Sequence, residues 1–267
     1  YIRTGENSLA QLLYAINGNT TDGLHADIFT KNPEDVKKDI KKIIDENGEY
    51  DFTRTVNYTG YGFAILRDGV LYKDAPSVSG VLSDSQRDFW IYYGGSTISH
   101  KHADALNLGI EAFGLNLAPD LGYPEDTGYN VNREQWVNNT ISHNTVVVNE
   151  KKQNQNAYAH TPLHFDNGGN VKLMDIDAQT AYDETDIYRR TVVMVKLSED
   201  ISYGVDFFRI KGGNDHIYSF HSQSDEVSVS GVNLVAQGAG TYAGEDVEWG
   251  DESDEYANGF SWLGNVR

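Results

Sequence analysis

The 267-residue sequence contains no cysteine. A disulfide, a thiolate metal ligand and a thiol nucleophile are therefore all excluded, although this absence does not identify the compartment. Long apolar runs are missing as well, because no stretch approaches the roughly 18–20 residues that a membrane-spanning helix needs. We therefore expect no membrane span. The sequence also shows no initiator methionine and no signal-peptide pattern, and we interpret it as an internal piece of a longer protein.

Basic residues are scarce. Lysine and arginine number 21 against 40 aspartates and glutamates, which gives a formal net charge of −19. Such a surface argues against nonspecific binding of nucleic acid or of an anionic membrane. It also weighs mildly against a polyanionic substrate. A locally basic cleft can still face an anion, however, because salt screens charges beyond about 8 Å.

Two amphipathic helices are predicted at the start of the chain. The first ends near Gly18 and carries an apolar stripe at helical spacing, made of Leu9, Leu12, Leu13 and Ile16. The second starts from an Asn32 cap with Pro33 at the first helical position, and Gly48 ends it. Two isolated helices need a larger partner to cover their apolar faces, so we expect further helices before them.

From about residue 51 the pattern predicts a mainly β fold. Short segments rich in β-branched and aromatic residues alternate with Gly, Asn and Asp turns, and the chain holds 26 glycines and 17 tyrosines. Strands are expected at 62–67, 88–93, 105–113, 145–148, 191–197 and 202–210. No helical segment alternates with them, which favours an antiparallel β-sandwich over a parallel α/β fold. We expect a long loop over 118–142 and an incomplete strand over 262–267.

The segment 99–107, SHKHADALN, carries the candidate chemistry. His100 and His102 are two residues apart, so on an extended strand they would face the same side, beside Asp104. A metal or catalytic site and a purely structural role both remain open from these residues alone. Asp120 in a turn-like PDLGY and His143 before a buried strand favour the metal or catalytic site. A set of two histidines and an aspartate suits Zn²⁺.

The segments YYGGSTISHKHADALNLGIEAFGLNLAPDLGYP and NNTISHNTVVVNEKKQ resemble signatures of the heparinase II/III-like polysaccharide lyases and the related oligoalginate lyases. GYGFAILRDG and YRRTVVMVKLSEDISYGVDFFRIKGGNDHIYSFH resemble other strands of the same domain, so the likeness covers about residues 50–225. It implies an antiparallel β-sandwich over 51–267, preceded over 1–50 by the last helices of an α/α toroid.

The resemblance also implies residue roles. His102, Asp120 and His143 would bind zinc, and His100 would face the substrate cleft and take part in catalysis. Tyr129, chosen over Tyr123, would contact substrate. The main catalytic tyrosine and its partner would come from the toroid, outside this chain. Lys101 stands where relatives often have a small residue, a departure that bears on the charge of the cleft.

The expected activity is β-elimination of a uronic-acid-containing polysaccharide of glycosaminoglycan or alginate type. Arg133, Lys151 and Lys152 lie near the site segments and are candidates for contact with the anionic sugar, against a simple solvated role. The piece alone is expected to be inactive, and the family resemblance places the parent in the periplasm or outside the cell. Two alternatives stay open: a metal-dependent hydrolase, and a noncatalytic carbohydrate-binding sandwich with a structural metal.

Overall fold

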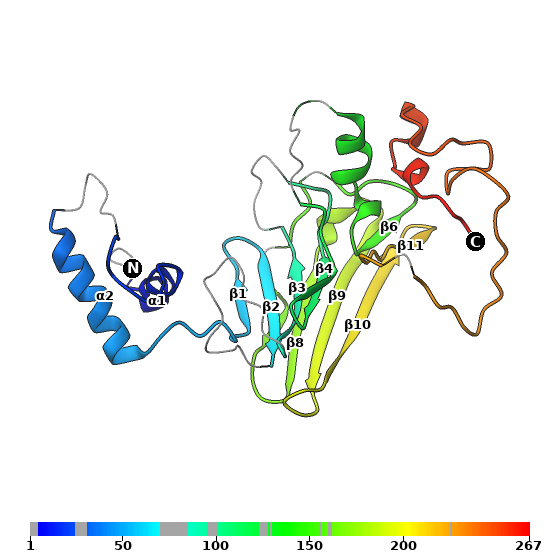
Figure 1. The fold of residues 1–267 in the computed structure, drawn as a ribbon. Helices are drawn as coiled ribbons and strands as arrows, with labels where there is room; N and C mark the ends of the chain where they lie inside the picture. The colour runs from blue at the N-terminus through cyan, green and yellow to red at the C-terminus, as the bar shows by residue number, and fades with distance from the viewer. Residues whose placement is uncertain are drawn as a thin grey trace.

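The computed structural model describes residues 5–24, 31–69, 85–94, 101–122, 128, 130–154, 156–159, 162–224 and 226–267. Helices α1 (Asn7–Ile16) and α2 (Pro33–Asn47) open the chain and lie to one side of a β-rich body (Figure 1). Within the described residues, no helix is long and apolar enough to span a bilayer.

The two helices start and end close to where the sequence predicts. Pro33 begins α2, and Gly48 follows it with a φ of 79°, which glycine adopts without steric cost. Ala10 and Ile40 are buried, but Leu9 and Leu13 remain 47% and 39% exposed. An apolar face of α1 is therefore left open, and the toroid that the resemblance implies for 1–50 stays a prediction.

The β body contains two antiparallel sheets. The first has the order β1-β2-β3-β4-β5 and the second the order β10-β9-β8-β7. Strands of the first sheet are β1 (Val56–Tyr58), β2 (Phe63–Asp68), β3 (Arg87–Tyr92), β4 (Asn107–Ala112) and β5 (Leu115–Ala118). Those of the second are β7 (His164–Asp166), β8 (Val171–Asp177), β9 (Thr185–Lys196) and β10 (Ser202–Gly212). The predicted antiparallel β class is confirmed.

The core lies between the facing sides of these sheets. Because side chains alternate along a strand, each strand gives the core every second residue. The first sheet contributes Ala64, Leu66, Ile91 and Leu108, and the second contributes Met174, Ile176, Tyr188, Val192 and Met194. Each large apolar side chain buried in this way stabilises the fold by about 1.5–3 kcal/mol. The opposite side of the first sheet does not contribute to this core.

A smaller pair of strands, β6 (Val146–Val148) and β11 (His216–Tyr218), lies beside the main sheets (Figure 1). Short helical turns accompany it: η1 (Arg133–Val137), η2 (Thr140–Ser142), η3 (Gln179–Ala181), η4 (Asp254–Tyr256) and η5 (Phe260–Trp262). Val147 packs with Ile141 and Phe260 in a second apolar cluster. This cluster fixes the C-terminal segment over β6.

Three expectations are corrected. Residues 118–142 are not one loop, because they hold the π-helical turn η1 and the 3₁₀ turn η2. Asn139 stabilises both: its side chain donates to the Gln135 carbonyl (3.0 Å) and accepts from the Thr140 N–H (2.8 Å). Residues 262–267 form no strand, since η5 ends there and no described strand pairs with them. The strand expected from 105 begins only at Asn107.

Candidate metal centre

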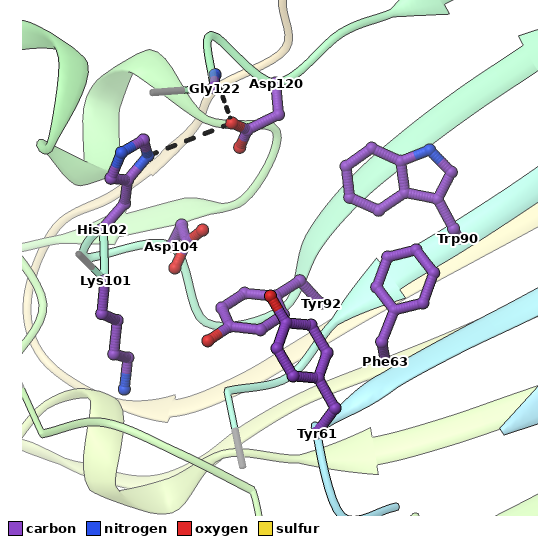
Figure 2. A pocket seen from close by; sticks show the side chains of 9 residues that line it. All are labelled: Tyr61, Phe63, Trp90, Tyr92, Lys101, His102, Asp104, Asp120 and Gly122. Atoms are coloured by element: carbon purple, nitrogen blue, oxygen red, sulfur yellow. Dashed lines mark hydrogen bonds and ion pairs between the residues drawn. The ribbon is translucent and has the colours of Figure 1, made fainter. Parts of the chain in front are cut away.

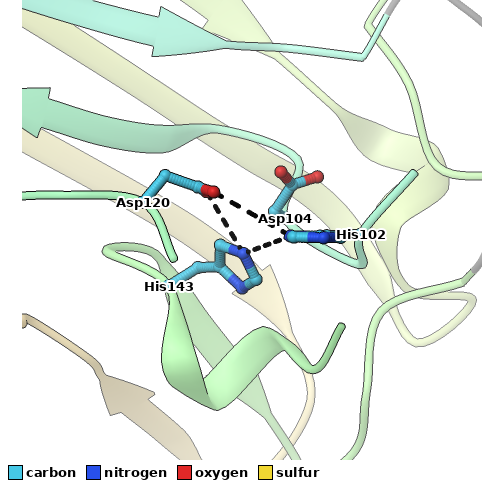
Figure 3. A group of neighbouring side chains, drawn as sticks. All are labelled: His102, Asp104, Asp120 and His143. Atoms are coloured by element: carbon cyan, nitrogen blue, oxygen red, sulfur yellow. Dashed lines mark hydrogen bonds and ion pairs between the residues drawn. The ribbon is translucent and has the colours of Figure 1, made fainter. Parts of the chain in front are cut away.

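Four side chains with metal-ligand chemistry converge at one edge of the first sheet (Figure 3). His102 and Asp104 lie in the segment before β4, Asp120 follows β5, and His143 lies between η2 and β6. One ligand-type atom from each lies within 4.8 Å of the others. Three of these residues are the set that the sequence predicts to bind zinc, and Asp104 joins them.

The separations suit a small divalent ion. His102 Nδ1 lies 3.1 Å from His143 Nε2, and His143 Nε2 lies 3.3 Å from Asp120 Oδ2. Two ligands of a tetrahedral zinc ion, each about 2.0–2.1 Å from the metal, lie about 3.3 Å apart. His102 Nδ1 and Asp120 Oδ1 are wider apart, at 4.0 Å. The residues therefore fit a zinc ion in chemistry and nearly in spacing.

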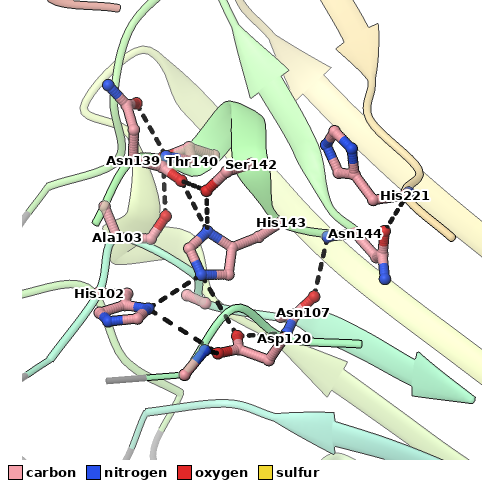
Figure 4. Close-up of polar contacts among 12 residues, drawn as sticks. His102, Ala103, Asn107, Asp120, Asn139, Thr140, Ser142, His143, Asn144 and His221 are labelled. Atoms are coloured by element: carbon pink, nitrogen blue, oxygen red, sulfur yellow. Dashed lines mark hydrogen bonds and ion pairs between the residues drawn. The ribbon is translucent and has the colours of Figure 1, made fainter. Parts of the chain in front are cut away.

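The orientation of His143 is fixed by its other ring nitrogen. Nδ1 lies 2.6 Å from the Asn139 carbonyl oxygen, which can only accept, so Nδ1 carries the proton and donates. Nε2 is thereby aimed at His102 and Asp120 (Figure 4). A histidine held in this way by a backbone carbonyl is the usual arrangement for a metal ligand.

Asp104 is the strongest sign that a cation belongs here. The residue is only 6% exposed, and its Oδ1 has no hydrogen-bond partner among the described residues. Burial raises the pKa of its carboxyl group to about 6. An unpaired buried carboxylate is costly unless a positive charge compensates it. A divalent ion between Asp104 and its three neighbours would supply that charge.

The other ionisable groups are tuned by burial and by one another. Burial and the nearby charge of His143 lower the pKa of His102 to about 4, so its ring is neutral near pH 7. Burial favours neutral forms of Asp120 and His143 too, but their mutual contact outweighs it. The pKa of Asp120 is therefore lowered and that of His143 raised. Asp120 thus stays ionised, as a metal ligand must.

A second layer of polar groups supports the ligands (Figure 4). Asn107 Nδ2 donates to Asp120 Oδ2 (3.1 Å), and its Oδ1 accepts from the Asn144 N–H (2.8 Å). Gly122 N–H donates to Asp120 Oδ1 at 2.7 Å. The guanidinium of Arg190, which is fully buried, donates to the carbonyls of Leu106 and Asn144. These bonds tie the loop of His102 to the loop of His143.

The expectation that His102 lies on an extended strand is wrong. Residues 101–106 form a turn, in which the Asn107 N–H donates to the Asp104 carbonyl (2.8 Å) and Leu106 has a φ of 64°. The two-residue alternation of a strand therefore does not apply at His102. His100 lies outside the described residues, so its position relative to His102 stays a prediction.

The predicted substrate contacts have separate outcomes. Tyr129 lies outside the described residues. Arg133 is the first residue of η1, and its Nη1 pairs with Glu134 Oε1 at 3.0 Å. Lys152 Nζ reaches the Glu134 carbonyl at 3.5 Å, and Lys151 pairs with Glu184. These contacts support a structural role for Arg133, Lys151 and Lys152. Their contact with a sugar remains a prediction.

A pocket of about 320 Å³ opens beside the four ligand-type residues (Figure 2). One side carries aromatic rings from β2, β3 and the turn before β2, and the other carries His102, Asp104, Asp120 and Gly122. Lys101 also lines it, and its ammonium group donates to the Ala157 carbonyl. Arg133 is not among the described residues that line this pocket. A concave site that is mostly apolar with a few polar groups is typical of ligand binding.

Comparison with known proteins identifies the family. The model of the C-terminal domain of heparinase II/III-like proteins matches residues 91–255, more than half of the sequence. The chain belongs to the heparinase II/III-like family. The matched range includes all four ligand-type residues, and of the aromatic residues that line the pocket it includes Tyr92. No curated protein sequence matches the chain.

One solved structure shares the fold of this heparinase II/III-like domain, and a second aligns less closely. A heparinase III, the BT4657 gene product, aligns with a TM-score of 0.54 at 19% identity, over 72% of this chain and 28% of its own. The heparan sulfate lyase HepC from Pedobacter heparinus aligns with a TM-score of 0.48 at 14% identity, over 78% and 28%. The chain therefore spans under a third of the length of these structures. At these identities the first likeness shows the fold alone.

Sequence reasoning missed several residues of this heparinase II/III-like site. Asp104 was noted only as a neighbour of the histidines, and Asn107, Asn139 and Arg190 were given no role in it. Asn107 follows Asp104 by three residues within the quoted motif. An amide beside a carboxylate-histidine set is a usable signal for a supporting residue. Arg190 carries no local signal for this role, because the two carbonyls that it binds beside the site belong to residues 46 and 84 positions away.

Proposed function

We propose that the chain is the β-domain part of a polysaccharide lyase that cleaves a uronic-acid-containing chain, of glycosaminoglycan or alginate type, by β-elimination. The observation that carries the proposal is the group of four converging ligand-type side chains in a chain of the heparinase II/III-like family. The printed name of one structural relative, a heparinase III, agrees with an acidic polysaccharide as substrate.

In this proposal His102, Asp120 and His143 hold zinc, and Asp104 completes the shell. Four protein ligands make a closed site, which is typical of structural zinc. The four side chains would hold the ion, and a bound ion would supply a positive charge that stabilises the loops of His102, Asp120 and His143 against one another. A metal-dependent hydrolase needs an open position for water instead, so four converging ligands favour the lyase.

The elimination itself moves one proton and breaks one bond. A base takes the C5 proton of the uronate, a C4–C5 double bond forms, and the C4–O bond to the next sugar breaks. The leaving oxygen takes a proton from an acid, so no water and no redox partner is consumed. Groups that neutralise the uronate carboxylate make the C5 proton easier to remove.

We assign His100 to this chemistry, as the base or as a group that holds the uronate. It precedes His102 by only one intervening residue, so anchoring His102 restrains His100 as well. Tyr129 and Arg133 are assigned to substrate contact. The remaining acid and base groups would come from the toroid domain, and the isolated piece would then be nearly inactive. The family resemblance supports a periplasmic or extracellular parent, which fractionation of cells expressing it would test.

The decisive experiment uses the full-length parent on a panel of heparan sulfate, chondroitin, hyaluronan and alginate, following the ultraviolet absorbance of the unsaturated product. Elemental analysis should find about one zinc per chain. His100→Ala should lower turnover by about 10²–10⁴-fold without changing metal content. His164→Ala, at an exposed position of β7, is the matched control. Hydrolysis without the unsaturated product would contradict the proposal, and so would full activity in His100→Ala.

A further inference from the structure

The outer side of the first sheet carries a row of aromatic rings. Phe63 pairs with Tyr92 across β2 and β3, and Trp90 pairs with Gly109 across β3 and β4. Alternation sends the neighbours Ala64 and Ile91 into the core, so Phe63, Trp90 and Tyr92 all face outward. Tyr61, 58% exposed in the turn before β2, extends the row. We call these four residues the aromatic platform.

Trp90, the largest ring of the platform, lies directly over a glycine. A Cβ atom added at Gly109 would come within 1.8 Å of Trp90 Cε2, so the indole rests directly on the backbone of β4. Only glycine leaves room for that approach. Phe63 packs beside the indole at 5.5 Å between centroids, and Tyr61 packs beside Tyr92 at 5.9 Å. Figure 2 shows these rings along one wall of the pocket.

The opposite wall is polar and includes the candidate metal centre. His102, Asp104 and Asp120 line the same pocket as the platform, together with Lys101. At about 320 Å³ the pocket is at the small end of the range for ligand sites. A wall of stacking rings facing a wall of hydrogen-bonding groups matches a sugar ring, which has apolar C–H faces and a polar rim.

We propose that the aromatic platform is a sugar-binding subsite, in which Trp90 and Phe63 stack on a pyranose ring of the acidic polysaccharide. The inference rests on the proposed function, which supplies the sugar chain. The stacked ring lies next to the ligand-bearing turn of His102, so it belongs to the sugar close to the reacting bond. Hydroxyl groups of Tyr61 and Tyr92 are available to the rim of that ring.

A segment of the parent protein could cover these rings instead, and the charges of the pocket argue against it. Two carboxylates and an ammonium group line a small pocket together with four aromatic side chains. A packing interface would leave those charges buried against apolar surface at high cost. A hydrated sugar can hydrogen-bond to them. We therefore commit to the sugar as occupant.

The test is calorimetric titration of the full-length parent protein, in a His100→Ala background that slows cleavage, with heparosan and alginate tetrasaccharides and with maltotetraose as an uncharged probe. Trp90→Ala should weaken binding of the acidic probe about 3- to 10-fold, as expected for one lost stacking contact. Trp90→Phe should keep most of the affinity. Trp249→Ala, at a residue that packs edge-to-face against Trp262 in the C-terminal segment, is the matched control and should bind like the unmodified protein.

Gly109→Ala tests whether the position of the Trp90 indole matters, and not only its presence. It retains the indole but forces it off β4, so it should weaken binding as Trp90→Ala does, with thermal melting measured alongside. Equal affinity in Trp90→Ala and in the unmodified chain would overturn the inference. A full-length Trp90→Ala variant with lower thermal stability but unchanged KM would overturn it too, in favour of a packing face. If the parent protein binds the sugar but has no lyase activity, the result supports the aromatic platform as a sugar-binding subsite and refutes only the proposed function.

Discussion

Arg190 offers the most direct test of how this fold holds its site together. The side chain lies in the core of the β body with no exposed surface, on β9. Its Nε and Nη2 bind the two carboxylate oxygens of Asp206 at 2.9 and 2.8 Å. Its Nη1 donates to the carbonyls of Leu106 and Asn144, and Nη2 reaches the Tyr218 hydroxyl at 3.1 Å. One cation therefore satisfies four separate acceptors.

Arg190→Met fills much of the same volume but removes every donor. Asp206 then loses its cationic partner and keeps only the Tyr218 hydroxyl (2.9 Å). The Asn144 carbonyl keeps the Leu108 N–H (3.1 Å), but the buried Leu106 carbonyl loses the donor that Arg190 supplied. Breaking a buried pair in this way costs about 3–5 kcal/mol. That is a large share of the roughly 5–15 kcal/mol by which domains are stable. Arg190→Lys should lose less, because an ammonium group keeps the charge but lacks the two-pronged geometry.

Urea unfolding followed by circular dichroism measures this loss, at fixed metal concentration. Arg209→Met is the matched control, because that side chain is 52% exposed on the neighbouring strand β10 and pairs with Asp175 at 3.2 Å. The free energy of unfolding of this control should fall by no more than about 1 kcal/mol. The Arg190 variants should also bind zinc about 10- to 100-fold more weakly, since Leu106 and Asn144 flank the ligand loops. A loss below about 1 kcal/mol in Arg190→Met would refute the reasoning.

Three further predictions follow from the same contacts. Asn107→Ala should weaken zinc binding about 10- to 100-fold in competition with a chromophoric chelator, while Asn116→Ala on exposed β5 should not. Burial alone would raise the pKa of Asp175, but hydrogen bonds from Arg189 and Thr191 outweigh it and hold the pKa below its usual value. That stabilisation is present above the unfolded pKa of about 3.9 and is lost as pH falls through the lower folded value. Urea midpoints between neutral and acidic pH should therefore fall less for Asp175→Asn than for the unmodified chain. Chelation should lower the melting temperature by about 5–10 °C, and His102→Ala should abolish that response.

The sequence sufficed for the β class and for three of the four converging residues, for physical reasons. The strand signal, a short segment rich in β-branched and aromatic residues, is local in the sequence. β2, β3 and β10 could therefore be predicted nearly to their ends. His102, Asp120 and His143 were predicted as zinc ligands from the resemblance to heparinase II/III-like lyases, and a set of two histidines and an aspartate agrees with zinc chemistry. Their convergence could not be derived, since it depends on pairing between strands far apart in sequence.

The misses have physical causes as well. Residues 101–106 were expected to be extended because apolar residues alternate from the end of this segment, at Leu106, Leu108 and Ile110. The left-handed backbone at Leu106, with a φ of 64°, is set by contacts such as that of Arg190 with its carbonyl. The start of β9 was predicted six residues late, because 185–190 contains charged residues that usually face solvent. Arg190 is buried there only because Asp206 lies on the adjacent strand.

The charge of the pocket connects the metal to the sugar. The chain carries a net charge of −19, and Asp104 and Asp120 add two carboxylates to the pocket that would receive an acidic sugar. A bound divalent ion would neutralise both and leave Lys101 as the uncompensated charge lining that pocket. Charges that lie within about 8 Å of a ligand are only partly screened by salt, so this local change outweighs the distant acidic surface.

This argument gives a last prediction. Removing the ion should weaken binding of an acidic tetrasaccharide more than binding of an uncharged one, under conditions in which the chain stays folded. The comparison is calorimetric, with and without chelator, and circular dichroism reports the fold. Lys101→Met should reproduce the selective loss in the presence of metal, and Lys211→Met, at an exposed side chain of β10 paired with Asp186 at 2.9 Å, should not. Equal loss for both sugars would mean that the ion shapes the pocket without setting its charge.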